Sequence, residues 1–288
     1  AYRRQRQMCI RDRSRPVRIR LGSVGTVFGA VVTAIIFMSA VVIPYLSITL
    51  AAMTILRSAP PTPNNLTFDY FSIVVQMPTA QEALVRSIGL GALGATTAVA
   101  LGVLVTVLTR RQSTIAAKFS DFLAIAPDTV PGIVLAIGFI LLWNSPWLPW
   151  SPYGTMGMLV MAFTVLFLPM AIQNIKASAD SVSPTVYEAA AISGSSTLHT
   201  FGRITLPLLA PGIFAGWLLA FFVGIRELVM SSLIRPSQVN LLAPWIMNQF
   251  DQGHRAEAMA MTLIGVGTST IVLVAITWWQ NRKAAHAR

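Results

Sequence analysis

The sequence predicts an all-α, polytopic membrane protein with six transmembrane helices. Hydrophobic residues make up 55% of the 288-residue chain and charged residues only 11%, against roughly a quarter charged in an average soluble domain. Charge-free apolar stretches recur at the length of about twenty residues that a helix needs to cross about 30 Å of hydrocarbon. The Lys and Arg residues between these stretches concentrate in alternate loops, as expected of a chain that threads repeatedly through a membrane.

The N-terminal part carries much of the basic charge. Arginines concentrate in residues 1–20, and the formal net charge is +11. No aromatic-interleaved basic face accompanies them, so the charge does not favour nucleic-acid binding. Residues 1–13 resemble translated sequencing-adapter reads, which would make them non-native and the chain a piece of a longer protein; the alternative is an ordinary basic cytoplasmic tail. Cys9 is the only cysteine, which excludes a disulfide framework and a thiolate metal cluster.

The first four spans follow from three charge-free stretches. Residues 21–56 exceed the length of one span, so we expect this helix to tilt or to extend beyond the membrane. Residues 87–109 supply the second span. The stretch 129–175 is too long for one helix and contains NSPWLPWSPYG, whose prolines and glycine predict a turn. It divides into a third span at 129–147 and a fourth at 153–172.

The fifth span is predicted at 208–234 and the sixth at 258–280. With both termini in the cytoplasm, sixteen Lys and Arg residues lie inside and four lie outside; without the five arginines of residues 1–13, the comparison is eleven against four. Because Lys and Arg are retained on the cytoplasmic side, this orientation is the favoured one. We interpret residues 21–288 as one transmembrane domain that follows the basic tail at 1–20.

The longest polar cytoplasmic loop, residues 173–207, is predicted to contain two short helices. Ser183 before Pro184 suits an N-cap followed by proline at the first helical position, and TVYEAAAIS is a good helix former. Gly194 ends this helix, because glycine readily adopts the left-handed conformation required at a helix C-terminus.

The second short helix leads into the fifth span. Ser195 or Ser196 serves as its N-cap. Leu198, Phe201 and Ile204 recur at three-residue spacing and form an apolar edge. The loop is therefore predicted to be an exposed ledge, attached to a membrane helix, that fits the groove of a partner protein.

The same loop resembles a family motif, the EAA motif of type I ABC-importer permeases. Seven identities fall at fixed spacing over twenty positions: Glu188, Ala189, Ala190, Gly194, Ile204, Leu206 and Pro207. The segments LTFDYF, PDTVPGIVLAIG and FLPMAI extend the resemblance over nearly the whole chain beyond the tail. GIRELVMSSLI resembles the fifth span of the ferric-iron, phosphonate and polyamine permease group.

The resemblance implies a type I ABC importer permease fold and a transport subunit that is not an enzyme. Residues 188–207, with Arg203, are then expected to dock on a separate ATPase, which binds ATP and magnesium, so that this chain needs no cofactor. The other implied partners are a second permease, identical or homologous, and a periplasmic or lipid-anchored solute-binding protein. The implied location is the bacterial inner membrane. The implied substrate is a solute of the ferric iron, phosphonate or polyamine type. If the chain is truncated, it would be the second half of a longer fused permease.

Arg226 and Glu227 form the only charged pair inside a predicted span. A charge at membrane depth costs at least a few kcal/mol unless it is partnered or faces water. Adjacent helical residues point about 100° apart, so we expect the two side chains to contact different surfaces. One interpretation is a gate or substrate contact, with Ser231 and Ser232 as further hydrogen-bonding groups. The other is a structural ion pair with another helix or with the partner permease.

Two glycine patterns have structural interpretations. GLGALG, residues 89–94, has the spacing of dinucleotide sites but lies inside an apolar span without a preceding strand, so we expect it to serve helix packing. Gly212 and Gly216, spaced four apart, either allow close helix contact or only ease the turn near Pro211.

The histidines are too scattered to predict a metal site, and we expect none. They are His199, His254 and His286. A polar cluster before the sixth span is either a solvated loop or a contact for a solute-binding protein; it consists of Asp251, His254, Arg255 and Glu257.

Two rival functions stay open. In an ion-gradient-driven secondary transporter, Arg226 and Glu227 would be the coupling residues. In a membrane-embedded enzyme, Glu188, His199 or Glu227 would act in acid–base catalysis and would have to converge in one cavity. Outside coupling and catalysis, Glu188 could serve only as a cap or as a partner of Arg203.

Overall fold

The computed structural model describes four stretches of the chain: residues 22–56, 58–110, 114–183 and 185–286. Within them the regular structure is helical, and the only pairing of extended residues is an isolated bridge between Thr54 and Leu66. The predicted all-α class is therefore confirmed. The expectations for the basic tail, Cys9 and Pro184 fall outside the described residues.

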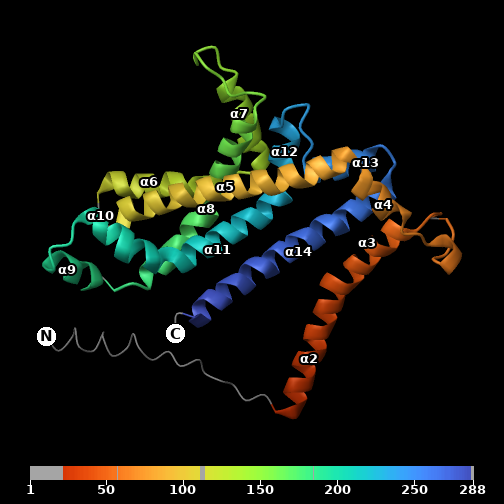
Figure 1. The fold of residues 1–288 in the computed structure, drawn as a ribbon, viewed down its shortest axis with the longest axis horizontal. Coiled ribbons are helices and arrows are strands. Elements are labelled where there is room, and N and C mark those ends of the chain that lie inside the picture. The colour runs from red at the N-terminus through yellow and green to blue at the C-terminus, as the bar shows by residue number, and fades with distance from the viewer. Residues whose placement is uncertain (1–21, 57, 111–113, 184, 287–288) are drawn as a thin grey trace. The chain divides into compact units, whose positions relative to one another are not determined.

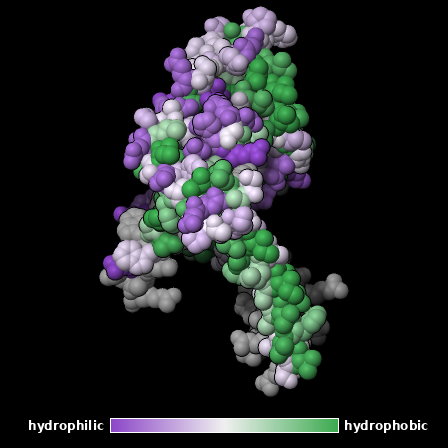
Figure 2. All heavy atoms as spheres, turned by 90° about the vertical axis from the view of Figure 1, so that its right-hand side faces the viewer, coloured by the Kyte–Doolittle hydropathy of each residue, from purple (hydrophilic) through white to green (hydrophobic). Residues whose placement is uncertain are grey.

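The chain divides into two compact units, residues 1–48 and 49–288. Helix α2 (Ser23–Phe37) continues through a π-helical turn, η1 (Met38–Val42), into α3 (Ile43–Met53). Pro44 has no N–H, and its ring crowds the carbonyl of Ala40, four residues earlier; the wider π turn accommodates this clash. Most side chains of α2 are exposed and apolar, and Figure 2 colours most of this helix as hydrophobic.

Three long helices form the centre of the second unit. They are α5 (Pro78–Arg110), α8 (Met156–Asp180) and α11 (Leu206–Ile225), which pack against one another (Figure 1). Phe163 and Phe167 of α8 meet edge to face with ring centroids 5.4 Å apart, and Phe221 of α11 is buried with them. These rings therefore fill the interface between the central helices, where edge-to-face pairs pack favourably.

The remaining elements of this unit include a 32-residue helix and several short helices. They are η2 (Pro63–Asn65), α4 (Asp69–Gln76), α6 (Ile115–Ile125), η3 (Ala126–Thr129), α7 (Gly132–Trp143), α9 (Thr185–Ile192), α10 (Thr197–Thr200), η4 (Phe201–Thr205), α12 (Val229–Ile234), α13 (Leu242–Asp251) and α14 (Arg255–His286). Within the described residues, five helices are long and apolar enough to cross a membrane, and a bent helix pair makes a sixth candidate.

The predicted third span, 129–147, is wrong as a single helix. Helix α7 has 12 residues, about 18 Å at 1.5 Å per residue, which is too short to span alone. It follows the segment Ile115–Thr129 at a bend of 114°. Val130 lies in the extended region because it precedes Pro131, and a proline disfavours helical conformation in the residue before it.

The predicted fifth span, 208–234, is also not one helix. A continuous helical segment runs from Thr197 to Ile225 and then stops, and α12 begins separately at Val229. The charged pair at positions 226 and 227 therefore lies in a break between two helices and not inside one.

Glycines set the distance between α11 and α8. A Cβ on Gly212 would lie 2.3 Å from the carbonyl oxygen of Asn174 and 2.5 Å from Oγ of Ser178. A Cβ on Gly216 would lie 3.1 Å from Cα of Ala171. The structure thus supports close helix contact as the role of this glycine pair, since backbone atoms cannot move aside as a flexible side chain can.

We predict that Gly212→Ala destabilises the protein by about 1–3 kcal/mol, because the overpacking cost exceeds the helix-propensity gain of up to about 1 kcal/mol. Thermal unfolding in detergent measures the change. Gly267→Ala in α14 is the matched control, since apart from the neighbouring backbone of its own helix no described atom lies within 4 Å of its added Cβ. Equal unfolding temperatures for the two variants would refute the packing argument.

Candidate functional site

The first part of the predicted ledge is helix α9, and it ends where the sequence predicts. Gly194 has φ +72°, the left-handed conformation. Its N–H donates to the carbonyl of Ala191 at 3.0 Å, and the N–H of Ser195 donates to the carbonyl of Ala190 at 3.1 Å. This pair of hydrogen bonds is the Schellman motif, which satisfies the last carbonyls of a helix and turns the chain sharply.

The second part of the ledge is rigidly joined to the core helix α11. Ser196 is the N-cap of α10, and its Oγ accepts from the backbone N–H of His199 at 3.4 Å. The chain then continues through the π turn η4 into α11 without a loop. The π turn contains Arg203, whose carbonyl the ring of Pro207 would otherwise crowd.

Two apolar side chains project from the ledge. Ile192 is 88% exposed and Leu198 is 80% exposed. The predicted apolar edge is only partly correct, because Phe201 and Ile204 are half-buried, with Phe201 packed against the core. The exposed apolar surface therefore lies on either side of the Gly194 turn.

A hollow of about 290 Å³ lies between the two short helices of the ledge. Its lining consists of Tyr187, Glu188, Ala191, Ser195, Thr197 and Thr200. Glu188 and Arg203 are both exposed, and among the described ion pairs none joins them. The predicted pairing of Glu188 with Arg203 is therefore not seen.

The second candidate site is the break between α11 and α12. Arg226 ends α11 with φ −104° and ψ 7°, outside the helical region. The Glu227 carboxylate accepts from the backbone N–H of Met230 at 2.9 Å and of Ser231 at 2.8 Å, and from Oγ of Ser231 at 3.0 Å. Glu227 thus satisfies the free amides at the start of α12, as a capping side chain does.

This geometry corrects part of the sequence interpretation. Ser231 is 2% exposed and its hydroxyl is bonded to Glu227, so it is not free to bind a substrate. Ser232 is exposed. Arg226 and Glu227 have different hydrogen-bond partners, but both line a hollow of about 500 Å³ beside α8, so the prediction that they contact different surfaces is only partly correct.

Close backbone contact fixes the position of the break. A Cβ on Gly224 would lie 3.2 Å from Cα of Gly91 on α5 and 3.1 Å from the Phe167 ring. Gly91 belongs to the GLGALG segment, which lies within helix α5 and serves packing, as predicted. The chain therefore leaves α11 directly after a tight helix crossing.

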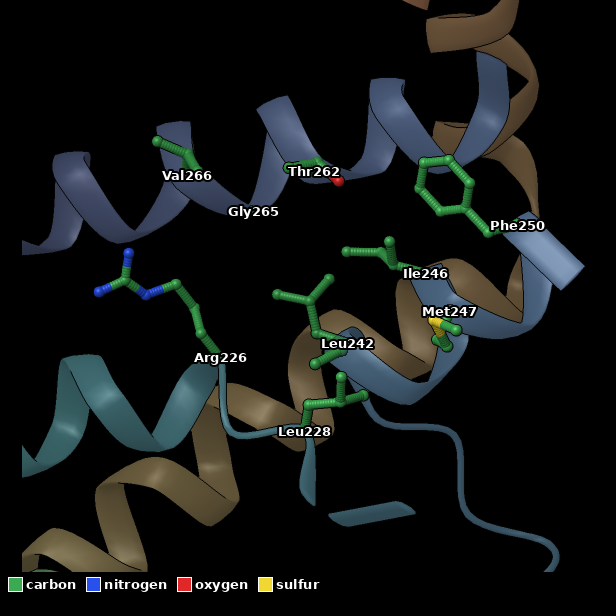
Figure 3. A pocket seen from close by; sticks show the side chains of 10 residues that line it. Arg226, Leu228, Leu242, Ile246, Met247, Phe250, Thr262, Gly265 and Val266 are labelled. Carbon is green, nitrogen blue, oxygen red and sulfur yellow. The ribbon is translucent and has the colours of Figure 1, made fainter. Parts of the chain in front are cut away.

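Arg226 extends into a hollow of about 340 Å³. Figure 3 shows it reaching from the end of α11 toward Val266 on α14. Its Nε donates to the carbonyl of Phe222 at 3.3 Å. The rest of the lining is almost wholly apolar: Leu228, Leu242, Ala243, Ile246, Met247, Phe250, Thr262, Gly265 and Val266.

Polar contacts with α5 hold α13, which forms one wall of this hollow. The buried Ser87 Oγ accepts from the backbone N–H of Leu242 at 2.7 Å. Trp245 donates from Nε1 to Oγ1 of Thr79 at 3.2 Å. Sequence reasoning missed these contacts, because they join residues more than 150 positions apart.

The remaining candidates do not assemble into a site. His254 Nδ1, in the exposed loop before α14, lies 4.0 Å from Oε1 of the half-buried Glu257 in the first turn of α14. Glu188 and His199 lie on the ledge, whereas Glu227 lies at the other end of the twenty-residue helix α11 (Figure 1). The three groups proposed for an enzyme therefore do not converge. In the part of the chain that the structure describes, no three His, Cys, Asp or Glu side chains group as metal ligands.

We predict that Glu227→Ala loosens α12, because two backbone amides lose their acceptor, at a cost of about 1–3 kcal/mol. The expected result is faster hydrogen exchange at the amides of Met230 and Ser231 and a lower unfolding temperature. Ser232→Ala is the control, because this exposed side chain should be replaceable without effect. Unchanged exchange in Glu227→Ala would contradict the capping role.

The chain is similar to known transport proteins over most of its length. It is 22% identical over 224 residues to a putative 2-aminoethylphosphonate transport system permease protein of Salmonella choleraesuis (strain SC-B67), covering 77% of this chain and 83% of that protein. It is 26% identical over 164 residues to a putrescine transport system permease protein of Escherichia coli (strain K12), covering 57% of each.

A solved structure shares the fold. It is the bacterial alginate ABC transporter in complex with alginate pentasaccharide-bound periplasmic protein, with a TM-score of 0.67 at 16% identity, covering 86% of this chain and 91% of that one. Residues 98–286, more than half of the chain, match the family model described as the binding-protein-dependent transport system inner membrane component. The chain therefore belongs to this family, the multi-pass inner-membrane permease subunits of ABC importers.

Proposed function

We propose that this chain forms the substrate path of an ABC importer and works by alternating access, driven by a separate ATPase subunit that grips the ledge. The observation that carries the proposal is the uninterrupted helical segment from Thr197 to Ile225. Because α10 continues into α11 without a loop, a displacement of the ledge must move a helix of the membrane core.

The surface of the ledge suits a protein groove. Ile192 and Leu198 expose apolar side chains next to the fixed turn at Gly194. Burial of such side chains contributes about 1.5–3 kcal/mol each relative to exposure. The matched motif positions, from Glu188 to Pro207, supply the rest of the docking segment, including Arg203.

Membership of the family supports a set of partner subunits for this chain. We propose a second permease, identical or homologous, two ATPase subunits that bind ATP and magnesium, and a solute-binding protein on the outer side. Asp251, His254, Arg255 and Glu257 lie in or next to the exposed loop that would face this protein. The Lys and Arg distribution supports cytoplasmic termini.

We propose a solute of the ferric iron, phosphonate or polyamine type as substrate. The similarity to permeases named for 2-aminoethylphosphonate and putrescine supports two of these classes, and the resemblance of GIRELVMSSLI supports the group as a whole. The rival ion-coupled transporter finds less support, because its presumed coupling residue Glu227 is bonded to the start of α12.

We predict that Gly194→Val abolishes co-purification of the ATPase subunit with the tagged permease from membranes that contain both. A β-branched residue is strained at φ +72°, so the turn between α9 and α10 is lost. Gly154→Val is the matched control, because Gly154 has φ +73° and equally open surroundings but lies at the other end of α8.

Leu198→Asp tests the contact without altering the backbone. It should weaken ATPase binding at least about tenfold while the permease remains folded, since a buried apolar contact is replaced by a desolvated charge. Retention of the ATPase by both Gly194→Val and Leu198→Asp would refute the ledge as the docking surface. Absence of any ATPase from the wild-type complex would favour the ion-coupled transporter.

A further inference from the structure

Arg226 directly follows the candidate span Thr197–Ile225 and lies opposite the middle of the candidate span of α14. The candidate span of α14 runs from Arg255 to Trp278, and Val266 lies eleven residues after the first and twelve before the second. The Arg226 side chain reaches toward Val266 (Figure 3). A guanidinium group stays protonated in proteins, and next to apolar surface its charge is costly unless an anion or water meets it.

Few groups among the described residues bind the guanidinium of Arg226. Of its five N–H donors, the Nε–H bonds to the carbonyl of Phe222 at 3.3 Å. The described ion pairs join Glu82 with Arg86, Asp121 with Lys176 and His254 with Glu257, and none includes Arg226. Among the described residues, the two terminal nitrogens of Arg226 have no hydrogen-bond partner and remain available to a ligand.

The adjacent carboxylate forms no described ion pair with Arg226. Both oxygens of Glu227 are bonded to Met230 and Ser231 of α12. Asp128, beside α8, accepts from Gln173 at 3.5 Å and does not line the hollow next to Arg226. Glu227 keeps its negative charge and lines a neighbouring hollow of about 500 Å³ together with Arg226. It is held on α12, however, and does not line the hollow between Arg226 and α14.

The apolar walls of the hollow strengthen the electric field of the Arg226 guanidinium. Apart from Arg226, only Thr262 contributes a polar side chain to the lining. A charge among low-dielectric walls acts on a nearby ion far more strongly than the same charge in water.

We propose that Arg226 selects solutes that carry an anionic group, such as a phosphonate, phosphate or carboxylate, as they cross the membrane. This inference rests on the proposed transport function and narrows its substrate class. A polyamine carries only positive charge and is repelled at this position. Arg226 is thus a specificity-determining residue, whereas Glu227 is a structural cap.

The attraction of anions by Arg226 can be measured without a transport assay. In a Cys9→Ser background, Val266→Cys places one thiol opposite Arg226, and Leu273→Cys places one two turns further along α14. Anionic sulfonatoethyl and cationic trimethylammonioethyl methanethiosulfonates are applied to membranes that contain the chain with its co-expressed partners. The ratio of anionic to cationic labelling rates is the readout.

Arg226→Gln should lower this ratio at Val266→Cys at least about fivefold and leave it unchanged at Leu273→Cys. Arg226→Lys should preserve the ratio, because it keeps the charge. An unchanged ratio in Arg226→Gln would overturn the proposal, since it means that an acidic group of the partner permease neutralises Arg226 or that the charge faces elsewhere.

The transport part uses the whole complex in proteoliposomes with 2-aminoethylphosphonate and putrescine as probes. We expect uptake of the phosphonate, lowered at least about tenfold by Arg226→Gln and retained by Arg226→Lys, with ATPase binding unaffected. Uptake of putrescine that is insensitive to Arg226→Gln would overturn the inference. A complex that lacks ATPase binding would instead refute the proposed function, and the labelling ratio would still report whether Arg226 attracts anions.

Discussion

The close approach of helix backbones through glycine is the constraint on which the second unit depends. In a lipid environment apolar side chains gain nothing by leaving the solvent, so helices associate through close packing and hydrogen bonds. Gly212 and Gly216 bring α11 against α8, and Gly224 meets Gly91 of α5. With α11 held at three points, both of its ends acquire defined positions, and both candidate sites lie at those ends.

Backbone hydrogen bonding explains why the two neighbouring charges have different roles. A helix that stops inside a membrane leaves amides and carbonyls that water cannot reach, and each must find a partner within the protein. Glu227 supplies the partner for the amides at the start of α12. Arg226 cannot do so, because a guanidinium has no acceptor, and its charge is left facing the hollow between α11 and α14.

Local chemistry made the ledge predictable from the sequence. The glycine conformation at Gly194 and the serine cap at Ser196 each follow from one or two residues, and the structure has both. The bend at Val130 and the break after Ile225 were not predicted, because an apolar stretch reveals its length and not its direction. Proline before α7 was a signal that could have divided the third span. The bond from Ser87 to Leu242 had no local signal, since only the tertiary fold brings these residues together.

The π turn at Phe201–Thr205 has a consequence for how such a ledge can change. A π turn holds one more residue than the α-helical turn it replaces, and one residue rotates everything beyond it by about 100°. The direction in which Leu198 points, relative to the core face of α11, is therefore set by a single inserted residue. Loss or gain of that residue would rotate the ledge about the helix axis, so that it would fit a differently shaped partner. The contacts of α11 with α5 and α8 would stay in place.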